Sequence, residues 1–287
     1  MKKSHFKTHL LFYVLITMLL ALIVWTIWGN TALMANSITL SGNQIPSEFS
    51  GFRIAQVSDL HNAEFGEGNS HLLNSLSESK PDMIAITGDL VDAQHTNIDV
   101  ALSFAEKAVQ IAPVYYVTGN HEASLSQYSE LKTGLEAAGV IVLEDKAIQL
   151  EHNGGIVTLM GLSDPNFTIK SNIFDEVPAM ISTKLNDLME DKVGYTILLS
   201  HRPELFDTYV SCGVDLVLSG HAHGGQFRLP LIGGLVAPNQ GFFPKYDAGL
   251  YSDGGTNMVV SRGLGNSIIP LRFNNRPEIV LVELTAD

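Results

Sequence analysis

Short apolar runs alternate along the chain with longer stretches in which apolar residues recur every three or four positions. Apolar runs bounded by glycine and polar residues predict strands, and the longer periodic stretches predict helices. The predicted strands cover residues 52–57, 83–87, 114–118, 140–143, 156–162, 196–200, 215–219, 257–261 and 278–283. The predicted helices cover residues 70–79, 98–110, 125–138, 182–191 and 203–212.

Most of the predicted strands are apolar throughout and are separated by helices, which indicates sheets that are covered by helices. The chain therefore has the α/β pattern of one large domain. Residues 224–252 show little periodicity and predict a loop. A loop of that length in a compact domain is usually functional or wrongly assigned.

The N-terminal segment contains an uncharged apolar run over residues 10–28. A helix needs about 20 apolar residues to cross the hydrocarbon core of a membrane. Lys2, Lys3 and Lys7 precede the run, and the first charge after it is Glu48. The positive-inside rule predicts a cytoplasmic N-terminus and an exported domain.

A cleaved signal peptide is the alternative interpretation of this segment. The run is longer than the usual apolar region of a signal peptide, of about 7–15 residues, and Leu33 before Ala35 is a poor match to a cleavage site. We therefore expect an uncleaved single-pass anchor in residues 1–30. Residues 31–50, which are small and polar, predict a linker, and residues 51–287 predict the functional domain.

The chain is acidic, with 17 Lys and Arg against 30 Asp and Glu in 287 residues and a net charge of −13. Phosphate binding by nucleic-acid proteins draws its affinity from clustered Lys and Arg, so this composition disfavours a nucleic-acid groove. It does not exclude a small phosphorylated substrate held by metal. The single cysteine, Cys212, excludes an internal disulfide.

Acidic, amide and imidazole side chains follow five of the predicted strands. They are Asp59 and His61 in SDLH, Asp89 and Asp92 in GDLVD, Asn120, His121 and Glu122 in GNHE, His201 in SHRPE, and His221 and His223 in GHAHGG. Each motif alone has a structural alternative, since aspartates favour turns and isolated histidines are often hydrogen-bonded structural residues. Together they predict a metal site, because open α/β sheets place ligands at the carboxyl ends of their strands.

Seven of these residues offer nitrogen or oxygen ligands: Asp59, His61, Asp89, Asn120, His201, His221 and His223. That number exceeds the needs of one four-coordinate zinc and suits two divalent ions that share a carboxylate. Imidazole and carboxylate donors favour Mn, Zn or Fe. Two ions about 3.5–4 Å apart can share a hydroxide and stabilise an in-line displacement at phosphorus.

The series SDLH, GDLVD, GNHE, SHRPE and GHAHGG resembles the calcineurin-like metallophosphoesterase superfamily over nearly all of residues 50–287. The later segments GGQFRLPLIGGLVAPNQGFFPKYDAGLY and SRGLGNS are similar to its membrane-associated bacterial phosphodiesterase branch. The resemblance implies a four-layer αββα sandwich of two mixed sheets with the site at the strand ends.

The resemblance also implies a role for each site residue. One ion would bind Asp59, His61, Asp89 and His223, and the other would bind Asp89, Asn120, His201 and His221. His121 would contact the phosphate or leaving group, where it would stabilise charge or act as a general acid. Asp92 would orient the His121 ring from behind and raise its basicity.

The sequence therefore predicts a dimetal phosphohydrolase that acts on phosphodiesters. The alternatives are a phosphomonoesterase or protein phosphatase of the same superfamily, or a metal-binding surface protein without turnover. The aromatic and aliphatic residues of 224–252 would either cover the sheet or form an apolar wall for a lipid-linked or nucleotide-linked diester. Arg202, Arg262 and Arg272 could hold substrate phosphate, but ion pairing is the simpler interpretation.

Overall fold

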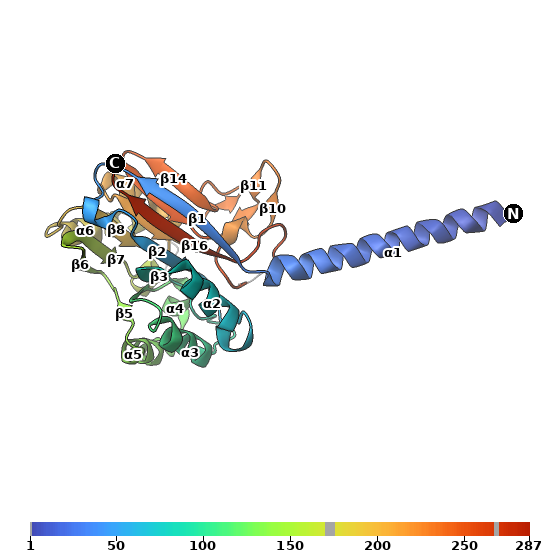
Figure 1. The fold of residues 1–287 in the computed structure, drawn as a ribbon, viewed down its shortest axis with the longest axis horizontal. Helices are drawn as coiled ribbons and strands as arrows, with labels where there is room; N and C mark the ends of the chain where they lie inside the picture. Colours follow the sequence, from blue (N-terminus) through green and yellow to red (C-terminus); the bar gives the residue numbers. More distant parts are fainter. Residues whose placement is uncertain (1, 170–175, 267–269) are drawn as a thin grey trace.

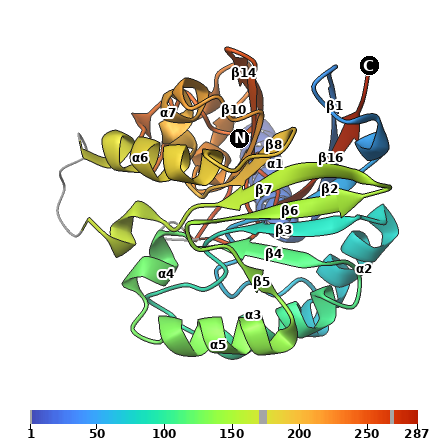
Figure 2. The same ribbon diagram turned by 90° about the vertical axis from the view of Figure 1, so that its left-hand side faces the viewer.

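Two six-stranded sheets pack face to face and helices cover both outer faces, which gives four layers (Figures 1 and 2). The structure is a computed structural model that describes residues 2–169, 176–266 and 270–287, with side chains described from residue 9 onward. The first sheet has the order β1-β16-β2-β3-β4-β5 and the second has the order β14-β15-β9-β8-β7-β6. Both are mixed, so the predicted fold class is confirmed.

The strands of the first sheet are β1 (Met34–Ser41), β16 (Glu278–Thr285), β2 (Arg53–Val57), β3 (Met83–Thr87), β4 (Val114–Val117) and β5 (Ile141–Val142). The strands of the second sheet are β14 (Gly249–Asp253), β15 (Thr256–Val260), β9 (Leu216–Ser219), β8 (Thr196–Leu199), β7 (Gly155–Gly161) and β6 (Lys146–His152). The central strands are buried on both faces, which explains why their sequences are apolar throughout.

Helices pack on the outer face of each sheet. Those on the first sheet are α2 (Ser70–Ser79), α3 (Ile98–Ala108) and α5 (Tyr128–Ala138), and those on the second are α6 (Val177–Met189) and α7 (Phe206–Ser211). Leu72, Phe104 and Leu135 join the helices to the first sheet in one apolar cluster. A second cluster fills the space between the sheets, and a third lies under α6 and α7.

The strand directions place the carboxyl ends of the central strands at one edge. β2, β3 and β4 are parallel to one another, and so are β7, β8, β9 and β15. β1 is parallel to β16, which is antiparallel to β2, and Asn36, Val280 and Gln56 lie side by side. The amino end of β1 therefore lies beside the carboxyl end of β2.

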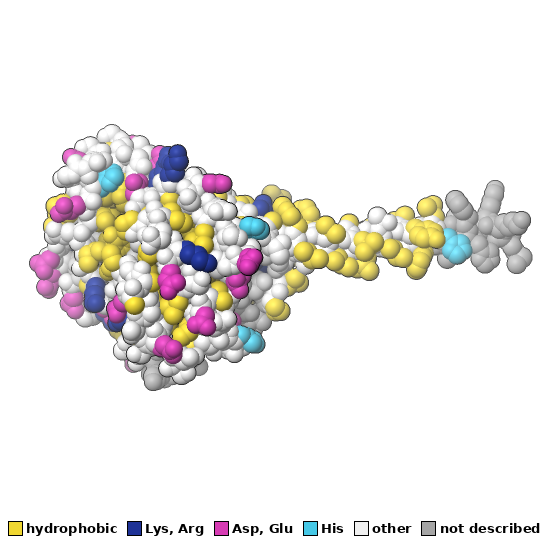
Figure 3. Space-filling model, turned by 60° about the horizontal axis from the view of Figure 1, so that its bottom comes forward, with side chains coloured by type: hydrophobic (Ala, Val, Ile, Leu, Met, Phe, Trp, Pro, Cys, Tyr) yellow, Lys and Arg dark blue, Asp and Glu magenta, His cyan; other side chains and the backbone are white. Residues whose placement is uncertain are grey.

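The N-terminal helix α1 (Lys2–Thr31) runs directly into this edge (Figure 1). Its segment His9–Thr31 has a mean hydropathy of 2.6 and is not buried, so it is long and apolar enough to cross a membrane. Figure 3 shows apolar side chains along the projecting helix. The side chains of Lys2, Lys3 and Lys7, on which the predicted orientation depends, lie outside the described part.

The prediction for residues 31–50 missed β1. Only two residues separate α1 from this strand, and β1 pairs with β16 over its whole length. The strand lies at the edge of the first sheet and its burial alternates along the chain. Such a strand lacks the continuous apolar run by which the central strands were identified.

Other differences are local. Strands β6 and β14 were missed for the same reason, because each is an edge strand with exposed residues. The helix expected over 125–138 begins three residues later, as α5, and a short helix that was not predicted, α4 (Asn120–Ser124), precedes it. The helix expected over 203–212 begins with a 3-10 turn at Pro203–Leu205. Within residues 224–252, four two-residue strands form two hairpins ahead of β14.

Candidate active site

The predicted ligands lie on the loops at the carboxyl edge, and five of them have an unusual backbone conformation. Asp59, His61, Asp89, His221 and His223 have φ between 46° and 66°. Residues other than glycine rarely adopt this left-handed backbone conformation. It costs about 1–3 kcal/mol of conformational free energy for each residue and persists only where the surrounding structure holds it. Such strain at five clustered residues is typical of a functional site.

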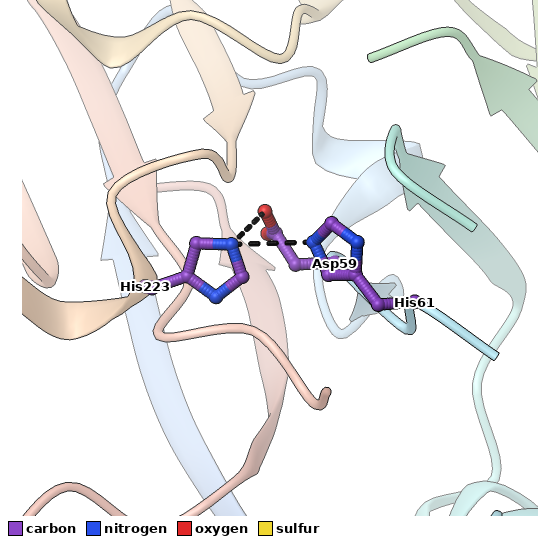
Figure 4. A group of neighbouring side chains, drawn as sticks. All are labelled: Asp59, His61 and His223. Carbon is purple, nitrogen blue, oxygen red and sulfur yellow. Dashed lines mark hydrogen bonds and ion pairs between the residues drawn. The ribbon is translucent and has the colours of Figure 1, made fainter. Parts of the chain in front are cut away.

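The first cluster consists of Asp59, His61 and His223, which converge from the loops after β2 and β9 (Figure 4). The Nε2 atoms of His61 and His223 are 3.2 Å apart, and Nε2 of His223 lies 3.3 Å from Oδ1 of Asp59. All three side chains are buried. Two facing ring nitrogens beside a carboxylate form a group of donors that a divalent ion can bind.

The second cluster consists of Asp89, His201 and His221. Oδ2 of Asp89 lies 3.1 Å from Nε2 of His201 and 3.7 Å from Nε2 of His61. Asp89 therefore lies between the two clusters. Asn120, the first residue of α4, has a buried Oδ1 atom that accepts no hydrogen bond from the residues that the structure describes.

Glycines make the close approach of these loops possible. A Cβ atom on Gly119 would lie 2.2 Å from Oδ1 of Asp89. A Cβ atom on Gly220 would lie 1.9 Å from Oγ of Ser58 and 2.4 Å from Oδ2 of Asp59. The turns that carry Asn120 and His221 thus need glycine, because any side chain there would displace an aspartate.

The electrostatics of the clusters fit cation binding. Burial lowers the pKa of His61 to about 4, and it lowers the pKa values of His221 and His223 well below their usual range. These rings are therefore neutral, which is the form in which histidine binds a metal ion. Burial raises the pKa of the Asp59 carboxyl to about 6; His201 opposes this shift and Asp89 adds to it. Two buried carboxylates this close need positive charge between them.

His201 supplies part of that charge. Burial disfavours its charged form, but the adjacent Asp89 carboxylate raises the pKa of His201 to about 10. A metal ion would replace this proton, because ligand histidines bind metal in the neutral form. Neutral imidazoles, carboxylates and an unpaired amide oxygen together fit two divalent ions of the Mn, Zn or Fe type.

A buried network supports the second cluster. Nδ1 of His201 lies 2.7 Å from the Thr87 carbonyl oxygen and donates a hydrogen bond to it, so the other ring nitrogen, Nε2, faces Asp89. Nη1 of Arg202 lies 3.0 Å from Nε2 of His221, and Oδ1 of Asn239 lies 2.8 Å from both atoms. Asp164 accepts two hydrogen bonds from Arg202, at 2.5 and 2.9 Å.

Asp164 and Asn239 were not among the site residues predicted from the sequence. Asp164 follows β7 at the same edge as the ligands, so the strand-end rule applied to that strand would have found it. Asn239 lies in the loop 224–252, and no sequence signal identified it. The ion pairing expected of Arg202 is confirmed, and Arg262 lies 3.6 Å from Glu278. Arg272 is buried, and its guanidinium donates to the carbonyl oxygens of Arg262 and Gly265.

Glu122 fixes the loop that carries Asp89. Its buried carboxyl accepts hydrogen bonds from the backbone amides of Asp89, Leu90, Val91 and Gly119, at 2.7–3.2 Å. Burial, with a contribution from Asp89, raises the pKa of Glu122 to about 7. This residue therefore ties the GDLVD loop to the GNHE turn.

A cavity of ≈ 350 Å³ opens beside the first cluster. Its lining consists of His61, Asn62, Asp92, Gln94, His95, His121, Asn266 and Pro270. The rings of His61 and His121 are 4.4 Å apart between centroids, in an edge-to-face arrangement. The histidine expected to assist the reaction and one expected ligand thus share this cavity.

The surroundings of His121 differ in part from the expectation. Nδ1 of His121 accepts a hydrogen bond from the Ala93 amide at 3.1 Å. Asp92 has a carboxylate oxygen within 4.8 Å of ring nitrogens of His61 and His121, and its Oδ1 accepts hydrogen bonds from the amides of Gln94 and His95. The backbone therefore contributes to orienting the His121 ring, with Asp92 as a nearby charge.

Comparisons with known proteins agree with this geometry. A sequence profile of the calcineurin-like phosphoesterase family matches residues 52–225. The chain is 30% identical over 251 residues to the metallophosphoesterase YkuE of Bacillus subtilis, which covers 86% of this chain and 83% of YkuE. It is 29% identical over 243 residues to the phosphodiesterase YaeI of Escherichia coli, which covers 81% and 82% of the two chains.

Among solved structures, TT1561 of Thermus thermophilus is similar in fold. The two structures superpose with a TM-score of 0.52 at 15% sequence identity, over 75% of this chain and 91% of TT1561. At this identity the similarity bears on the fold alone.

Proposed function

We propose, since the chain belongs to the calcineurin-like phosphoesterase family, that it is a two-metal phosphodiesterase held at a membrane by α1. Membership makes the protein a hydrolase of phosphoric esters, and the family depends on two metal ions. The observation that carries the finer assignment is the position of Asp89 between two buried clusters, 3.7 Å from His61 and 3.1 Å from His201.

The seven donors divide between two ions around Asp89. Asp59, His61 and His223 would hold one ion with Asp89, and Asn120, His201 and His221 would hold the other with it. Such ions activate water as a nucleophile and neutralise the oxygens of the phosphoryl group. The protein contributes a fixed set of donors, because strained loops, glycine turns and Glu122 hold the ligands in place.

His121 is the residue that we assign to the leaving group. It lines the cavity, and because Nδ1 accepts from the Ala93 amide, the neutral ring carries its proton on Nε2. This N–H can donate a hydrogen bond to the leaving oxygen and stabilise the negative charge that develops there as the bond to phosphorus breaks. Asp92, whose carboxylate lies near the ring, would help to hold it in place.

Preference for a diester is supported by the name of the relative YaeI, a phosphodiesterase. The test is hydrolysis of bis(p-nitrophenyl) phosphate and of p-nitrophenyl phosphate by the full chain loaded with Mn, Zn or Fe. We expect faster turnover of the diester. A preference for the monoester would assign a phosphomonoesterase, and turnover of neither ester with any metal would favour a binding protein.

The membrane part of the proposal rests on α1. Its apolar segment of 23 residues is exposed over most of its length, and two residues separate the helix from β1. We propose an N-terminus in the cytoplasm, a domain outside it, and a lipid-linked or nucleotide-linked diester as substrate. A protease added to intact cells should degrade the domain, and complete protection would reverse this orientation.

A further inference from the structure

Two hairpins carry exposed apolar residues. The first pairs β10 (Arg228–Leu229) with β11 (Gly233–Gly234), and the second pairs β12 (Val236–Ala237) with β13 (Gly241–Phe242). Leu231 and Ile232 lie in the turn of the first hairpin, whereas Phe242 and Phe243 lie at the end of β13, where Phe242 pairs with Val236. These four residues, here called the apolar tips, have exposed fractions of 108%, 60%, 81% and 64%. Large apolar side chains so fully exposed indicate a surface that meets an apolar partner.

The backbone at the apolar tips strengthens this interpretation. Leu231 has φ of 68° and Phe243 has φ of 56°. Turn positions with this conformation normally take glycine, asparagine or aspartate, which tolerate it and suit water. Leu231 and Phe243 combine an unfavourable backbone conformation with the exposure of a large apolar side chain to water. The Leu231 side chain is fully exposed, so packing within the described part of the chain does not offset this cost.

Hydrogen bonds connect these hairpins to the end of α1. Gln226 and Arg228 bond to the carbonyl oxygens of Leu271 and Phe273, at 2.7 and 3.0 Å. Between those two residues, Arg272 bonds to the side chain of Asn30 through both its amide and its carbonyl, at 2.8 and 3.0 Å. Asn30 lies in the last turn of α1, so the hairpins are held beside the point where the helix leaves the domain.

Further contacts fix α1 at this point. The guanidinium of Arg276 lies over the Trp28 ring, 4.5 Å from its centroid, and bonds to the carbonyl oxygens of Ala32 and Leu33. Leu271 and Phe273 are themselves 40% and 37% exposed. Figure 1 shows β10 and β11 on the side of the body from which α1 projects, and Figure 2 shows β10 on the same far side as the helix.

The catalytic cavity opens at the same edge. The carboxyl ends of β2, β3 and β4 lie at the same edge of the sheet as the amino end of β1, which follows α1 after two residues. Asn266, which lines the cavity, donates a hydrogen bond to Oδ1 of Asn30 at 3.4 Å. The end of the apolar helix, the apolar tips and the cavity therefore share one side of the domain.

We propose that the apolar tips rest in the lipid surface of the membrane that α1 spans, so that the catalytic cavity opens onto the bilayer and takes a lipid phosphoester from it. This inference rests on the proposed anchor and deepens the proposed function. The occupant is lipid because a membrane crossed by α1 must end near Asn30, where Trp25 and Trp28 suit its interface. The apolar tips then lie at the depth where exposed Leu and Phe are favoured.

The first test measures the depth of the apolar tips. Full-length chain with Cys212→Ser and Leu231→Cys carries a spin label and is placed in nanodiscs of phosphatidylcholine and phosphatidylglycerol. We expect the label to be accessible to oxygen and shielded from a water-soluble nickel chelate. Val193→Cys is the matched control, because Val193 is apolar, 41% exposed and lies in the turn before β8, at the opposite end of the strands. Equal nickel access at both positions would overturn the proposal.

The second test separates docking from catalysis. Leu231→Asp in the same nanodiscs should lower hydrolysis of phosphatidylglycerol about ten-fold, while hydrolysis of soluble bis(p-nitrophenyl) phosphate stays within about two-fold. Val193→Asp should change neither rate. An equal loss on both esters would mean a structural role and would overturn the docking. A full chain that hydrolyses neither ester would overturn the proposed function, and the label depths would still decide the docking.

Discussion

The two donor clusters contain the same kinds of ligand but differ in what surrounds them. Each joins one aspartate to two histidines. In the second cluster the outer ring nitrogens are held, since Thr87 binds His201 and Asn239 and Arg202 bind His221. In the first cluster, Nδ1 of His223 has a longer contact, 3.5 Å to Nη2 of Arg272. Nδ1 of His61 has no hydrogen-bond partner among the described residues, and the His61 ring lines the cavity.

This difference separates two tasks. Partners behind a ligand fix its tautomer and orientation, and their loss typically costs about 10–100-fold in metal affinity or activity. The second cluster is therefore built to retain its ion. The first cluster lies at the cavity, where substrate meets the site, and its ion should exchange more readily.

Asp89→Ala should have the largest effect, because it removes the carboxylate that both clusters share. We expect turnover to fall by more than about 10³-fold and both ions to be lost, as the removal of even one group that stabilises charge costs about 10²–10³-fold. Metal analysis and diester turnover of the same preparation check this. Asp191→Ala, an exposed carboxylate in the turn before β8, is the control. Full activity in Asp89→Ala would reject the assignment.

His121→Ala should lower turnover by about 10²–10³-fold and leave the metal content unchanged. The reason is that the loss of one hydrogen-bond donor that stabilises developing charge typically costs about 10²–10³-fold, whereas His121 belongs to neither cluster of the comparison. Turnover and metal content are measured together, with the exposed His71→Ala as control. A loss of metal in His121→Ala would make this residue a ligand.

Asn239→Ala should weaken metal binding at the second cluster by about 10–100-fold and leave metal affinity at the first cluster unchanged. The reason is that the Asn239 side chain bonds to His221, which belongs to the second cluster. A competitive chelator titration that follows both ions measures this. Asn153→Ala is a matched control, since Asn153 also has a left-handed backbone, φ of 50° against 58°, in a turn far from the site. Equal weakening at both sites would contradict the comparison.

The difference between the clusters was only partly predictable from the sequence. The ligands follow apolar strands, and the carboxyl ends of parallel strands meet at one edge, so local pattern was enough to bring them together. Asn239 lies between two-residue strands that are too short to show a period, and its contact with His221 depends on tertiary packing. The left-handed backbone of Leu231 and the pairing of β1 with β16 are equally non-local.

Asp92→Asn should have the smallest effect, a fall in turnover of about 10-fold with the metal content unchanged. Asparagine keeps an oxygen for the amides of Gln94 and His95, so the loop is preserved and only the charge near His61 and His121 is removed. The His121 ring keeps its hydrogen bond from Ala93. Steady-state turnover beside metal analysis measures the effect, with Asp191→Asn as control. The opposite outcome would be a fall in turnover as large as that in His121→Ala. That result would mean that the contribution of His121 to turnover depends on the Asp92 carboxylate more than on the Ala93 amide. The histidines beside the cavity would then be held by neighbouring side chains as those of the second cluster are, which contradicts the comparison.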